Sequence, residues 1–413
     1  MKRTVIIGAG IIGLATAYYL TRAGQEVTIF EKNEPGDGCS SVNMGWICPT
    51  LSQPLPAPGV IGGAIRGIFD RANPLYMGPA SVLPLVPWLM KFARSATQRH
   101  YEAGLAANLE VSRLTVELFA DFASEIGESL ESYDNGLLVV GLNDGELQSK
   151  RSEFTTIASR LGLRTPVVLS NEETLELEPA LSPKIVGGLL LPDDRHVRPE
   201  SFTEALTTWL LDHGVEFRTN LAITEMRRSG AKVDSVVADG ETIPVRSVLV
   251  AAGVWSRQLL RDLDFNLPVV AGKGYSVTGD FPGISLSRPV YLGSAGLSPF
   301  DGGLRYGGTM EFSGINTRID SQRVDSISQL VSRYLARPVD ARGATVRAGL
   351  RPMAPDGLPV MGQVPGTTNA YVATGHVMSG LSMALATGHI MSELITHQRK
   401  VVDLELLDPR RFK

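Results

Sequence analysis

A glycine-rich turn near the N-terminus, Gly8-Ala9-Gly10-Ile11-Ile12-Gly13, is the feature that most constrains the fold of this chain. It follows an apolar, β-branched run, Thr4 to Ile7, and precedes a stretch rich in Ala and Leu that ends at Arg22. A second β-branched run, 27–30, leads directly to Glu31. This order predicts a strand, a tight turn, a helix and a second parallel strand within about 30 residues.

The turn has the pattern of a dinucleotide-binding fingerprint, G-x-G-x-x-G between a strand and a helix. Gly8 makes the tight turn, Gly10 lets a pyrophosphate approach the backbone, and Gly13 lets the helix pack closely on the strand. The N-terminus of the helix stabilises the negative charge of the phosphates. Glu31 stands 18 residues after Gly13 and can accept hydrogen bonds from ribose hydroxyls. An acid at this position disfavours a 2′-phosphate, and therefore NADP.

Two later regions favour FAD over NAD, a choice that the glycine turn alone leaves open. Residues 39–45 are mostly small and polar and end in glycine, which suits a loop beside a pyrophosphate and an isoalloxazine ring. Residues 349–362 are rich in Gly and Pro, and residues 374–384 read as a glycine-bearing loop that runs into a helix. Backbone N–H groups at the start of that helix suit the pyrimidine edge of a flavin, which gains negative charge on reduction.

Composition restricts the class of protein further. Hydrophobic residues make up 43% of the chain and charged residues 20%, which is the balance of a soluble globular protein. The net charge of −4 gives no sign of nucleic-acid binding. Two cysteines, Cys39 and Cys48, are too few for a disulfide framework. The histidines show no metal-ligand spacing, so we assign no metal.

No apolar stretch reaches the roughly 20 residues of a membrane-spanning helix. Val5 to Leu20 is interrupted by three glycines, and no signal-peptide cleavage site follows it. Val82 to Met90 is apolar, but Pro84 and Pro87 are expected to break it. We therefore expect a cytoplasmic protein, and peripheral contact with the inner membrane stays open.

The elements expected of a nucleotide-binding domain are scattered along the chain. We predict that residues 1–54, 196–262 and 343–413 form one discontinuous, Rossmann-type FAD-binding domain. Residues 55–195 and 263–342 are predicted to form a substrate domain built on an antiparallel sheet. The fold class is therefore mixed α/β (α+β), with the two domains interleaved. Helical spacing also predicts a single helix over 105–126.

Seven stretches carry further recognisable motifs: 177–181 (LEPAL), 187–194 (GGLLLPDD), 250–256 (VAAGVWS), 273–276 (KGYS), 304–311 (LRYGGTME), 349–362 and 374–384. In this order they resemble the superfamily of FAD enzymes related to D-amino-acid oxidase, and within it the bacterial D-amino-acid dehydrogenases of the small-subunit type. The resemblance covers almost the whole chain. Two stretches depart from the pattern, Asp194 to Pro199 and Gly375 to Leu381, and they bear on the substrate rather than on the cofactor.

The resemblance implies oxidation of a D-amino acid or a related secondary amine, such as a D-proline-type imino acid, by hydride transfer from Cα to flavin N5. It also implies non-covalent FAD, because neither cysteine stands where the sarcosine-oxidase branch attaches its flavin. Two alternatives stay open: oxidation of a 2-hydroxy acid, and a flavin-binding subunit without turnover of its own. Oxygen and a quinone are both open as electron acceptors.

Three residues are candidates for substrate chemistry. Arg305 matches the region that binds the substrate carboxylate in the superfamily, and its planar guanidinium can make two parallel hydrogen bonds. Tyr275 can donate its hydroxyl to the same carboxylate. His376 is a candidate acid or base, with a structural or flavin-neighbour role as the alternative. Arg351 is placed beside the flavin by the resemblance, and a purely structural role is the alternative.

The residues predicted to bind FAD come from the glycine turn, the end of the second strand, the 39–45 loop and the later motifs. They are Gly8, Ala9, Gly10, Ile11, Ile12, Gly13, Glu31, Lys32, Ser40, Ser41, Asn43, Met44, Gly45, Ile223, Ala252, Gly253, Trp255, Gly349, Arg351, Gly375, His376, Ser379, Gly380, Leu381 and Ser382.

Overall fold

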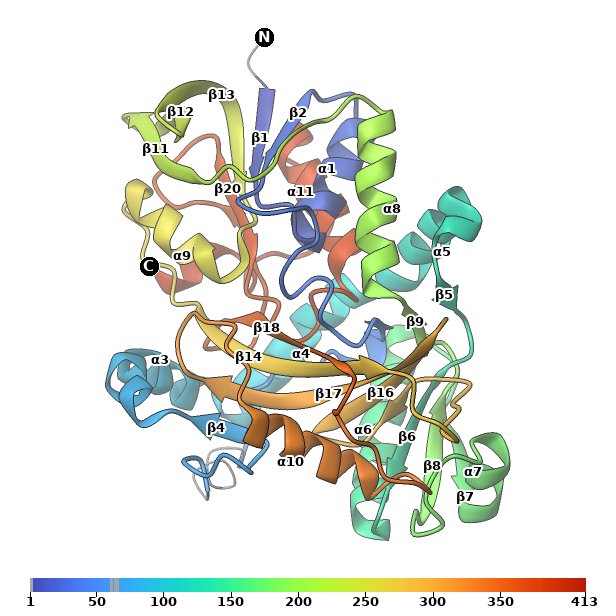
Figure 1. Cartoon of the computed structure of the whole chain (residues 1–413). Coiled ribbons are helices and arrows are strands. Elements are labelled where there is room, and N and C mark those ends of the chain that lie inside the picture. Colours follow the sequence, from blue (N-terminus) through green and yellow to red (C-terminus); the bar gives the residue numbers. More distant parts are fainter. Residues whose placement is uncertain (1–2, 60–61, 63–66) are drawn as a thin grey trace.

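The computed structural model describes residues 3–59, 62 and 67–413 of the chain. Two large β-sheets dominate it, one in the upper and one in the lower half of Figure 1. The upper sheet packs against α1 (Ile11–Arg22) and α11 (Ala384–His397), and α8 (Pro199–Asp212) packs beside α1. The lower sheet packs against α10 (Ser321–Ser332). In Figure 1, α10 lies below the lower sheet, and α1, α8 and α11 lie beside the strands of the upper sheet.

The upper sheet has eight strands with a parallel centre, as a Rossmann-type unit requires. Its path is β10-β2-β1-β13-β12-β11, and β13 also pairs with β20, which pairs with β19. The pairs among β10, β2, β1, β13 and β20 are parallel. The bounds are β1 Arg3–Ile7, β2 Val27–Phe30, β10 Glu216–Arg218, β11 Ile223–Ser229, β12 Lys232–Ala238, β13 Glu241–Val250, β19 Val360–Gln363 and β20 Ala370–Thr374.

The lower sheet has nine strands, in the order β18-β14-β17-β16-β15-β6-β8-β7, with β4 paired to β17. Most of its pairs are antiparallel, and the long strands β14, β17 and β18 form the part that faces the upper half of the molecule (Figure 1). The bounds are β4 Leu75–Met77, β6 Leu137–Gly141, β7 Val167–Ser170, β8 Gly187–Leu191, β14 Val270–Gly279, β15 Val290–Tyr291, β16 Ala295–Phe300, β17 Gly303–Phe312 and β18 Thr345–Met353.

The described residues also form a small three-stranded sheet, β3-β9-β5, six further α-helices and several short 3-10 helices. The strands are β3 Trp46–Ile47, β5 Ser132–Tyr133 and β9 Arg195–Val197. The helices are α3 Val82–Ser95, α4 Gln98–Ser112, α5 Thr115–Ile126, α6 Asp144–Leu161, α7 Asn171–Leu177 and α9 Ser256–Leu259.

Burial explains why the N-terminal strands were recognisable in the sequence. All four residues of β2 and the last four of β1 are buried, because helices and loops cover both faces of this parallel sheet. Separate apolar clusters pack on its two faces, one of them against α1, α8 and α11. A third cluster lies between the lower sheet and α10. Each large sheet thus has a core of its own, and the space between the sheets is left for the site.

The single helix predicted over 105–126 is wrong, because the structure has two helices there, α4 and α5. At the break, Ser112 Oγ is 2.7 Å from Ser52 Oγ, and Thr115 Oγ1 donates to the carbonyl of Ser382. These partners lie far away in the sequence. Helical spacing alone therefore could not reveal the break.

The expectation that Pro84 and Pro87 break the apolar run 82–90 is also wrong. α3 continues through both prolines. Pro84 lies in the first turn, where the missing N–H has no helical partner in any case. Pro87 removes the hydrogen bond to the carbonyl of Leu83, a residue that is exposed to solvent and can be hydrated instead.

The predicted domain division stays a prediction, and one of its boundaries disagrees with the strand pairing. β18 lies within 343–413, which was assigned to the FAD-binding domain, but it pairs along its length with β14 of the lower sheet. Among the described residues, no helix is both long and apolar enough to cross a membrane.

Candidate active site

A cavity of about 1790 Å³ is lined by residues of both large sheets. On one side its wall comes from the ends of β1, β2 and β13, and on the other from β14, β17 and β18. A pocket for one drug-sized ligand measures roughly 300–1,000 Å³, so this cavity has room for a dinucleotide and a small second molecule.

The glycine turn forms one end of the cavity and is shaped by close backbone contacts. Gly8 has φ +110°, and a Cβ on it would lie 2.7 Å from the carbonyl oxygen of Ala251. A Cβ on Gly13 would lie 2.0 Å from the carbonyl oxygen of Gly8. Neither residue can carry a side chain without moving the strand or the helix, which explains the glycines of the motif.

Two hydrogen-bond acceptors tie the turn to its neighbours. The carboxylate of Glu31 accepts from the backbone N–H of Ala9 at 2.8 Å and from that of Asn33 at 3.0 Å. Ser40 Oγ accepts from the N–H of Ile11 at 2.9 Å, which holds the 39–45 loop beside the turn. A carboxylate offers about four lone-pair sites, so Glu31, which lines the cavity, keeps acceptor capacity for a ligand's hydroxyls.

The start of α1 fits a phosphate group. Gly10 is the N-cap and has no side chain to cap the helix, Ser40 Oγ accepts from the N–H of Ile11 alone, and no acidic residue lies in the first turn. The first N–H groups of a helix have no partner within it, and they attract an anion. This end of the cavity therefore provides donors for a pyrophosphate and an acceptor for a ribose, as an adenine dinucleotide requires.

Arg351 lies on β18, at the end of the cavity formed by β17 and β18, and Lys32, Lys150 and Arg347 also line the cavity. The Nη1 of Arg351 donates to the carbonyl of Thr309 at 2.9 Å and lies 3.9 Å from Met310 Sδ. No Asp or Glu among the described residues forms an ion pair with it, and its Nε and Nη2 have no hydrogen-bond partner there. Burial lowers its pKa, and the interaction with the nearby Cys39 thiol opposes that effect. An enclosed guanidinium with free donors favours an anion as its ligand.

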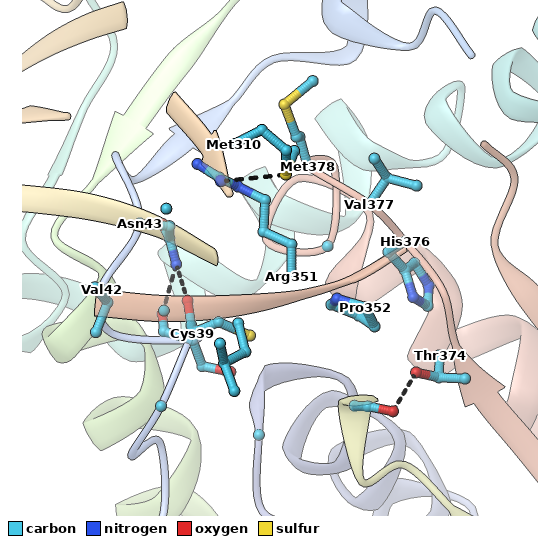
Figure 2. Close-up of a pocket in the computed structure, with 18 of the residues that line it drawn as sticks. Cys39, Val42, Asn43, Met310, Arg351, Pro352, Thr374, His376, Val377 and Met378 are labelled. Carbon is cyan, nitrogen blue, oxygen red and sulfur yellow. Dashed lines mark hydrogen bonds between the residues drawn. The ribbon is translucent and has the colours of Figure 1, made fainter. Parts of the chain in front are cut away.

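Two residues around Arg351 have strained backbones. Thr309 has φ +64° and Val377 has φ +53°, and both are β-branched, so their side chains disfavour this region. The carbonyl of Thr309 accepts from Arg351, and the N–H of Val377 donates to the carbonyl of Pro352. Figure 2 shows Arg351, Met310, Val377 and Met378 around the same space. Tertiary contacts therefore hold an unfavourable local geometry at this end of the cavity.

The wall beyond Arg351 is apolar. Side chains of β4, β17 and α3 form it, and many of them belong to one buried cluster. The residues of these elements that line the cavity are Leu75, Met77, Val82, Trp88, Leu89, Phe92, Met310 and Phe312, and Val377 of the loop after β20 adds to them.

Comparison with known proteins assigns the family. The family model described as FAD dependent oxidoreductase (DAO) matches residues 3–394. The chain belongs to this family of FAD-dependent oxidoreductases. It is 30% identical to a protein named D-amino acid dehydrogenase from Methylobacterium sp. (strain 4-46), over 100% of this chain and 99% of that protein.

Solved structures share the fold of this oxidoreductase at low sequence identity. L-proline dehydrogenase from P. horikoshii has a TM-score of 0.78 and 20% identity, with 100% of this chain and 97% of that one covered. Glycine oxidase from Geobacillus kaustophilus has a TM-score of 0.77 and 22% identity, with 98% of both chains covered. The predicted family and the predicted mixed α/β fold are confirmed.

The residues at the end of the cavity formed by the glycine turn fit FAD. Most of the predicted FAD-binding residues line the cavity. Their roles in binding stay predictions. Those that line the cavity are Gly8, Gly10, Ile11, Ile12, Glu31, Lys32, Ser40, Asn43, Met44, Ile223, Ala252, Gly253, Trp255, Gly349, Arg351, His376, Ser379, Gly380, Leu381 and Ser382.

Five of the predicted FAD-binding residues do not line the cavity, and each has a contact elsewhere. Ala9 donates its N–H to Glu31, and Gly13 packs on the carbonyl of Gly8. Ser41 Oγ accepts from Arg347. Gly45, with φ +76°, and Gly375, with φ +75°, make turns whose Cβ positions would strike Val197 and Val360. These residues shape the walls rather than the surface that a ligand would touch.

The structure contradicts the expected position of Arg305. It is 3% exposed, does not line the cavity, and forms an ion pair with Glu200 at 2.6 Å. Its guanidinium also donates to Thr278 Oγ1 and to the carbonyls of Ser41 and Asn43. Four of its five N–H donors are thus occupied. Arg305 holds the 39–45 loop against β17, and it is not placed to bind a carboxylate in the cavity.

Tyr275 is also committed elsewhere. Its hydroxyl donates to Glu311 Oε2 at 2.6 Å, and its ring packs in the cluster between the lower sheet and α10. Glu311 in turn pairs with Lys273 at 2.9 Å and lies 3.6 Å from Arg323 of α10. Burial and the hydrogen bond to Glu311 raise the pKa of Tyr275 far above its usual value. Tyr275 touches the cavity, but its hydroxyl is not free for a substrate.

His376 lines the cavity, but its environment does not suit an acid or base. Burial lowers its pKa to about 3, so the imidazole is neutral at physiological pH. Its Nε2 lies 3.0 Å from Thr387 Oγ1, and its buried Nδ1 has no protein partner. Figure 2 shows His376 next to Pro352 and below Val377. A neutral ring that polarises or positions a neighbour fits this geometry better than proton transfer.

The sequence analysis did not identify the part of the apolar wall that α3 and β4 contribute. No strand was predicted at β4, and the prolines were expected to break the run that forms α3. β4 reaches the cavity through its pairing with β17. Trp88 illustrates the missed signal. Its indole N–H donates to the carbonyl of Met353 at 3.0 Å, two residues after Arg351 in the chain. No group of three or more His, Cys, Asp or Glu in the described ranges is arranged to hold a metal.

Proposed function

We propose that this FAD-dependent oxidoreductase oxidises a D-amino acid, or a related secondary amine acid, whose carboxylate is bound by Arg351. The observation that carries the proposal is the state of Arg351, which is enclosed in the cavity and has one carbonyl acceptor and no acidic partner among the described residues. Removing a guanidinium from water without an anion is unfavourable, and a bidentate carboxylate compensates for it. The full-length relative named D-amino acid dehydrogenase supports this substrate class.

The apolar wall indicates which side chain the substrate carries. Trp88 and Phe312 lie 5.6 Å apart between ring centroids, and Met77 and Met310 belong to the same cluster. None of the described residues of α3, β4 and β17 that line the cavity is charged. Burying a charged substrate side chain against such a wall is unfavourable, whereas each buried CH2 contributes about 0.8 kcal/mol. We therefore propose an apolar or aromatic side chain.

FAD, when bound, supplies the two-electron oxidant that accepts the hydride from the substrate Cα. The chain's own residues then have two tasks. Arg351 orients the substrate through its carboxylate, and the wall around Trp88 excludes water from the reacting end. Orientation of this kind contributes much of the acceleration in such reactions.

We assign no residue at this end of the cavity as the base that accepts a proton from the substrate. His376 is neutral and resists protonation, and the hydroxyl of Tyr275 is held by Glu311. The substrate amine must therefore reach the site neutral, by losing its proton to solvent before or during binding. We propose that the rate rises with pH until the amine of the bound substrate is deprotonated.

An anaerobic flavin-reduction screen tests the proposed substrate. Bleaching of the flavin band by D-amino acids with apolar side chains is the expected result. Bleaching by 2-hydroxy acids alone would show that the substrate is a hydroxy acid. Absence of bleaching with every acid would indicate a flavin-binding subunit without turnover of its own.

We also propose that FAD is bound without a covalent link, so acid treatment should release it and leave the protein colourless. Yellow denatured protein would contradict this attachment.

A further inference from the structure

The two faces of helix α3 differ in how far their side chains are exposed to solvent. Trp88 and Leu85 are buried, and Leu89 lines the cavity. The outer face carries large apolar side chains in water, with Leu83 82% exposed and Met90 52% exposed. Figure 1 shows α3 at the edge of the molecule, beside β4. A soluble protein rarely leaves a continuous apolar surface without a use for it.

The outer face contains no polar residue over its first two turns. Leu83, Pro84, Val86, Pro87 and Met90 are all exposed, and a spacing of three, four and seven residues places their side chains on one side of a helix. This set is called the α3 apolar face below.

Positive charge borders the α3 apolar face. Lys91 and Arg94 follow in the last turns of the same helix, and Arg99 lies just beyond it. All three are exposed, and none forms an ion pair with a described residue. The chain has no Asp or Glu between Asp70 and Glu102, although its net charge is −4. The local charge is therefore opposite in sign to that of the whole protein.

We infer that the α3 apolar face docks on an anionic lipid bilayer. An apolar face with basic side chains at its border is the pattern of a helix that lies in the interface plane, with its apolar side chains among the acyl chains and its cations at the headgroups. The cavity adjoins this surface, because Val82, Leu89 and Phe92 of the same helix line it. Docking therefore places the apolar wall of the cavity next to the lipid.

A second copy of the chain fits this surface less well. A two-fold interface would bring the same patch of each copy together. The unpaired Lys91, Arg94 and Arg99 of one copy would then approach those of the other, and no acidic residue of the segment 71–101 is present to compensate. Repulsion of these like charges opposes such a dimer, whereas anionic headgroups neutralise them.

Sedimentation of the FAD-loaded protein with lipid vesicles tests the inference. We expect binding to vesicles of equal parts phosphatidylglycerol and phosphatidylcholine, weaker binding to phosphatidylcholine alone, and release by added NaCl. Leu83→Glu should lower the partition coefficient more than tenfold, because a leucine side chain leaves the acyl region. Leu211→Glu is the matched control, since Leu211 is also an exposed leucine, at 54%, but lies on α8, and it should bind like the wild type.

The charged border is tested separately. Lys91→Gln with Arg94→Gln should lower binding to the anionic vesicles by about 25-fold, since each basic residue near such a surface contributes roughly fivefold, equivalent to about 1 kcal/mol. Arg342→Gln, at an exposed arginine outside α3 and its charged border, should have no effect. FAD content and flavin reduction in solution should be unchanged in every variant, which keeps this test separate from the proposed function.

Three outcomes would overturn the inference. The first is no sedimentation with anionic vesicles. The second is equal loss of binding in Leu83→Glu and Leu211→Glu. The third is a concentration-dependent dimer, seen by analytical ultracentrifugation, that Leu83→Glu dissociates while vesicles bind neither form. This last result would assign the face to a second copy of the chain.

Discussion

Arg351 lies directly over Gly274 of the neighbouring strand. A Cβ built on Gly274 would come within 2.2 Å of Arg351 Nη1. The two strands pair antiparallel, with Gly272 opposite Arg351 and Gly274 opposite Gly349. The guanidinium can therefore cross the face of the sheet only because Gly274 has no side chain. The position of the cation in the cavity depends on a glycine that does not itself need to touch a ligand.

Gly274→Ala tests this relationship. The new methyl group displaces the guanidinium, which is the flexible end of its side chain, so the fold and the FAD content should survive. Because a misplacement of about 1 Å in a positioning group can lower the rate by roughly a hundredfold, we expect kcat/KM to fall by about tenfold to a hundredfold. Gly145→Ala is the control, since a Cβ there meets only Asn143 Oδ1 at 3.7 Å. Equal kinetics in both variants would show that a methyl group at position 274 does not displace the guanidinium of Arg351.

Arg351→Ala should remove the carboxylate site itself. Loss of one partner of a buried charge pair corresponds to about 2–5 kcal/mol, which predicts a fall in kcat/KM of roughly two to three orders of magnitude. Arg351→Lys should recover only part, because an ammonium lacks the planar fork of donors. Titration of the flavin spectrum with simple carboxylates gives a second measure, independent of turnover. Unchanged carboxylate affinity in Arg351→Ala would refute the assignment.

Arg305→Ala is expected to behave in a different way. It breaks the ion pair with Glu200 and frees the carbonyls of Ser41 and Asn43, which belong to the loop beside the glycine turn. Glu200 is partly exposed and keeps Arg347 as a second partner, so we expect a loss of about 2 kcal/mol of stability, between the values for exposed and buried pairs. FAD should also dissociate more readily. A large rise in KM with normal stability and FAD content would restore Arg305 as a substrate ligand.

Gly10→Val tests the phosphate site at the glycine turn. A Cβ at Gly10 already lies 3.2 Å from Ser40 Oγ, so a branched side chain would push Ser40 away and occupy the approach to the helix N-terminus. FAD content, measured by flavin absorbance per protein, should fall at least tenfold, while circular dichroism shows a folded apoprotein. Full occupancy in this variant would mean that the turn does not bind the pyrophosphate.

His376 makes stability depend on pH in a predictable direction. Its pKa is about 3 in the folded protein and near 6.5 when unfolded, so the unfolded chain binds the additional proton first as the pH falls. Between about pH 6 and pH 4 this group lowers the free energy of unfolding by up to roughly 1.4 kcal/mol per pH unit. Urea unfolding of His376→Gln over this range should show a shallower decline than the wild type. Parallel declines would show that the histidine is accessible to protons when folded.

Local and tertiary information contributed differently to the fold. β1, α1 and β2 were predictable because their contacts lie within about 30 consecutive residues and their burial leaves continuous apolar runs. α3 was misjudged, since the sequence rule on prolines takes no account of a first-turn position or of a solvated carbonyl. The division of 98–126 into α4 and α5 depends on Ser52 and Ser382, which no local window contains.

The sequence by itself determined the nucleotide-binding turn, the family and the identity of FAD, because these depend on adjacent residues whose spacing is preserved in the folded chain. Only the tertiary structure decided which arginine faces the substrate space. Arg305 and Arg351 both lie on strands of the lower sheet, and both are largely enclosed. Arg305 forms an ion pair with Glu200, which lies on a helix distant in the sequence. Arg351 passes over Gly274 and donates a hydrogen bond to the carbonyl of Thr309. The partner of a buried charge is chosen by strand register and long-range packing, and these cannot be determined from the residues adjacent to it in the chain.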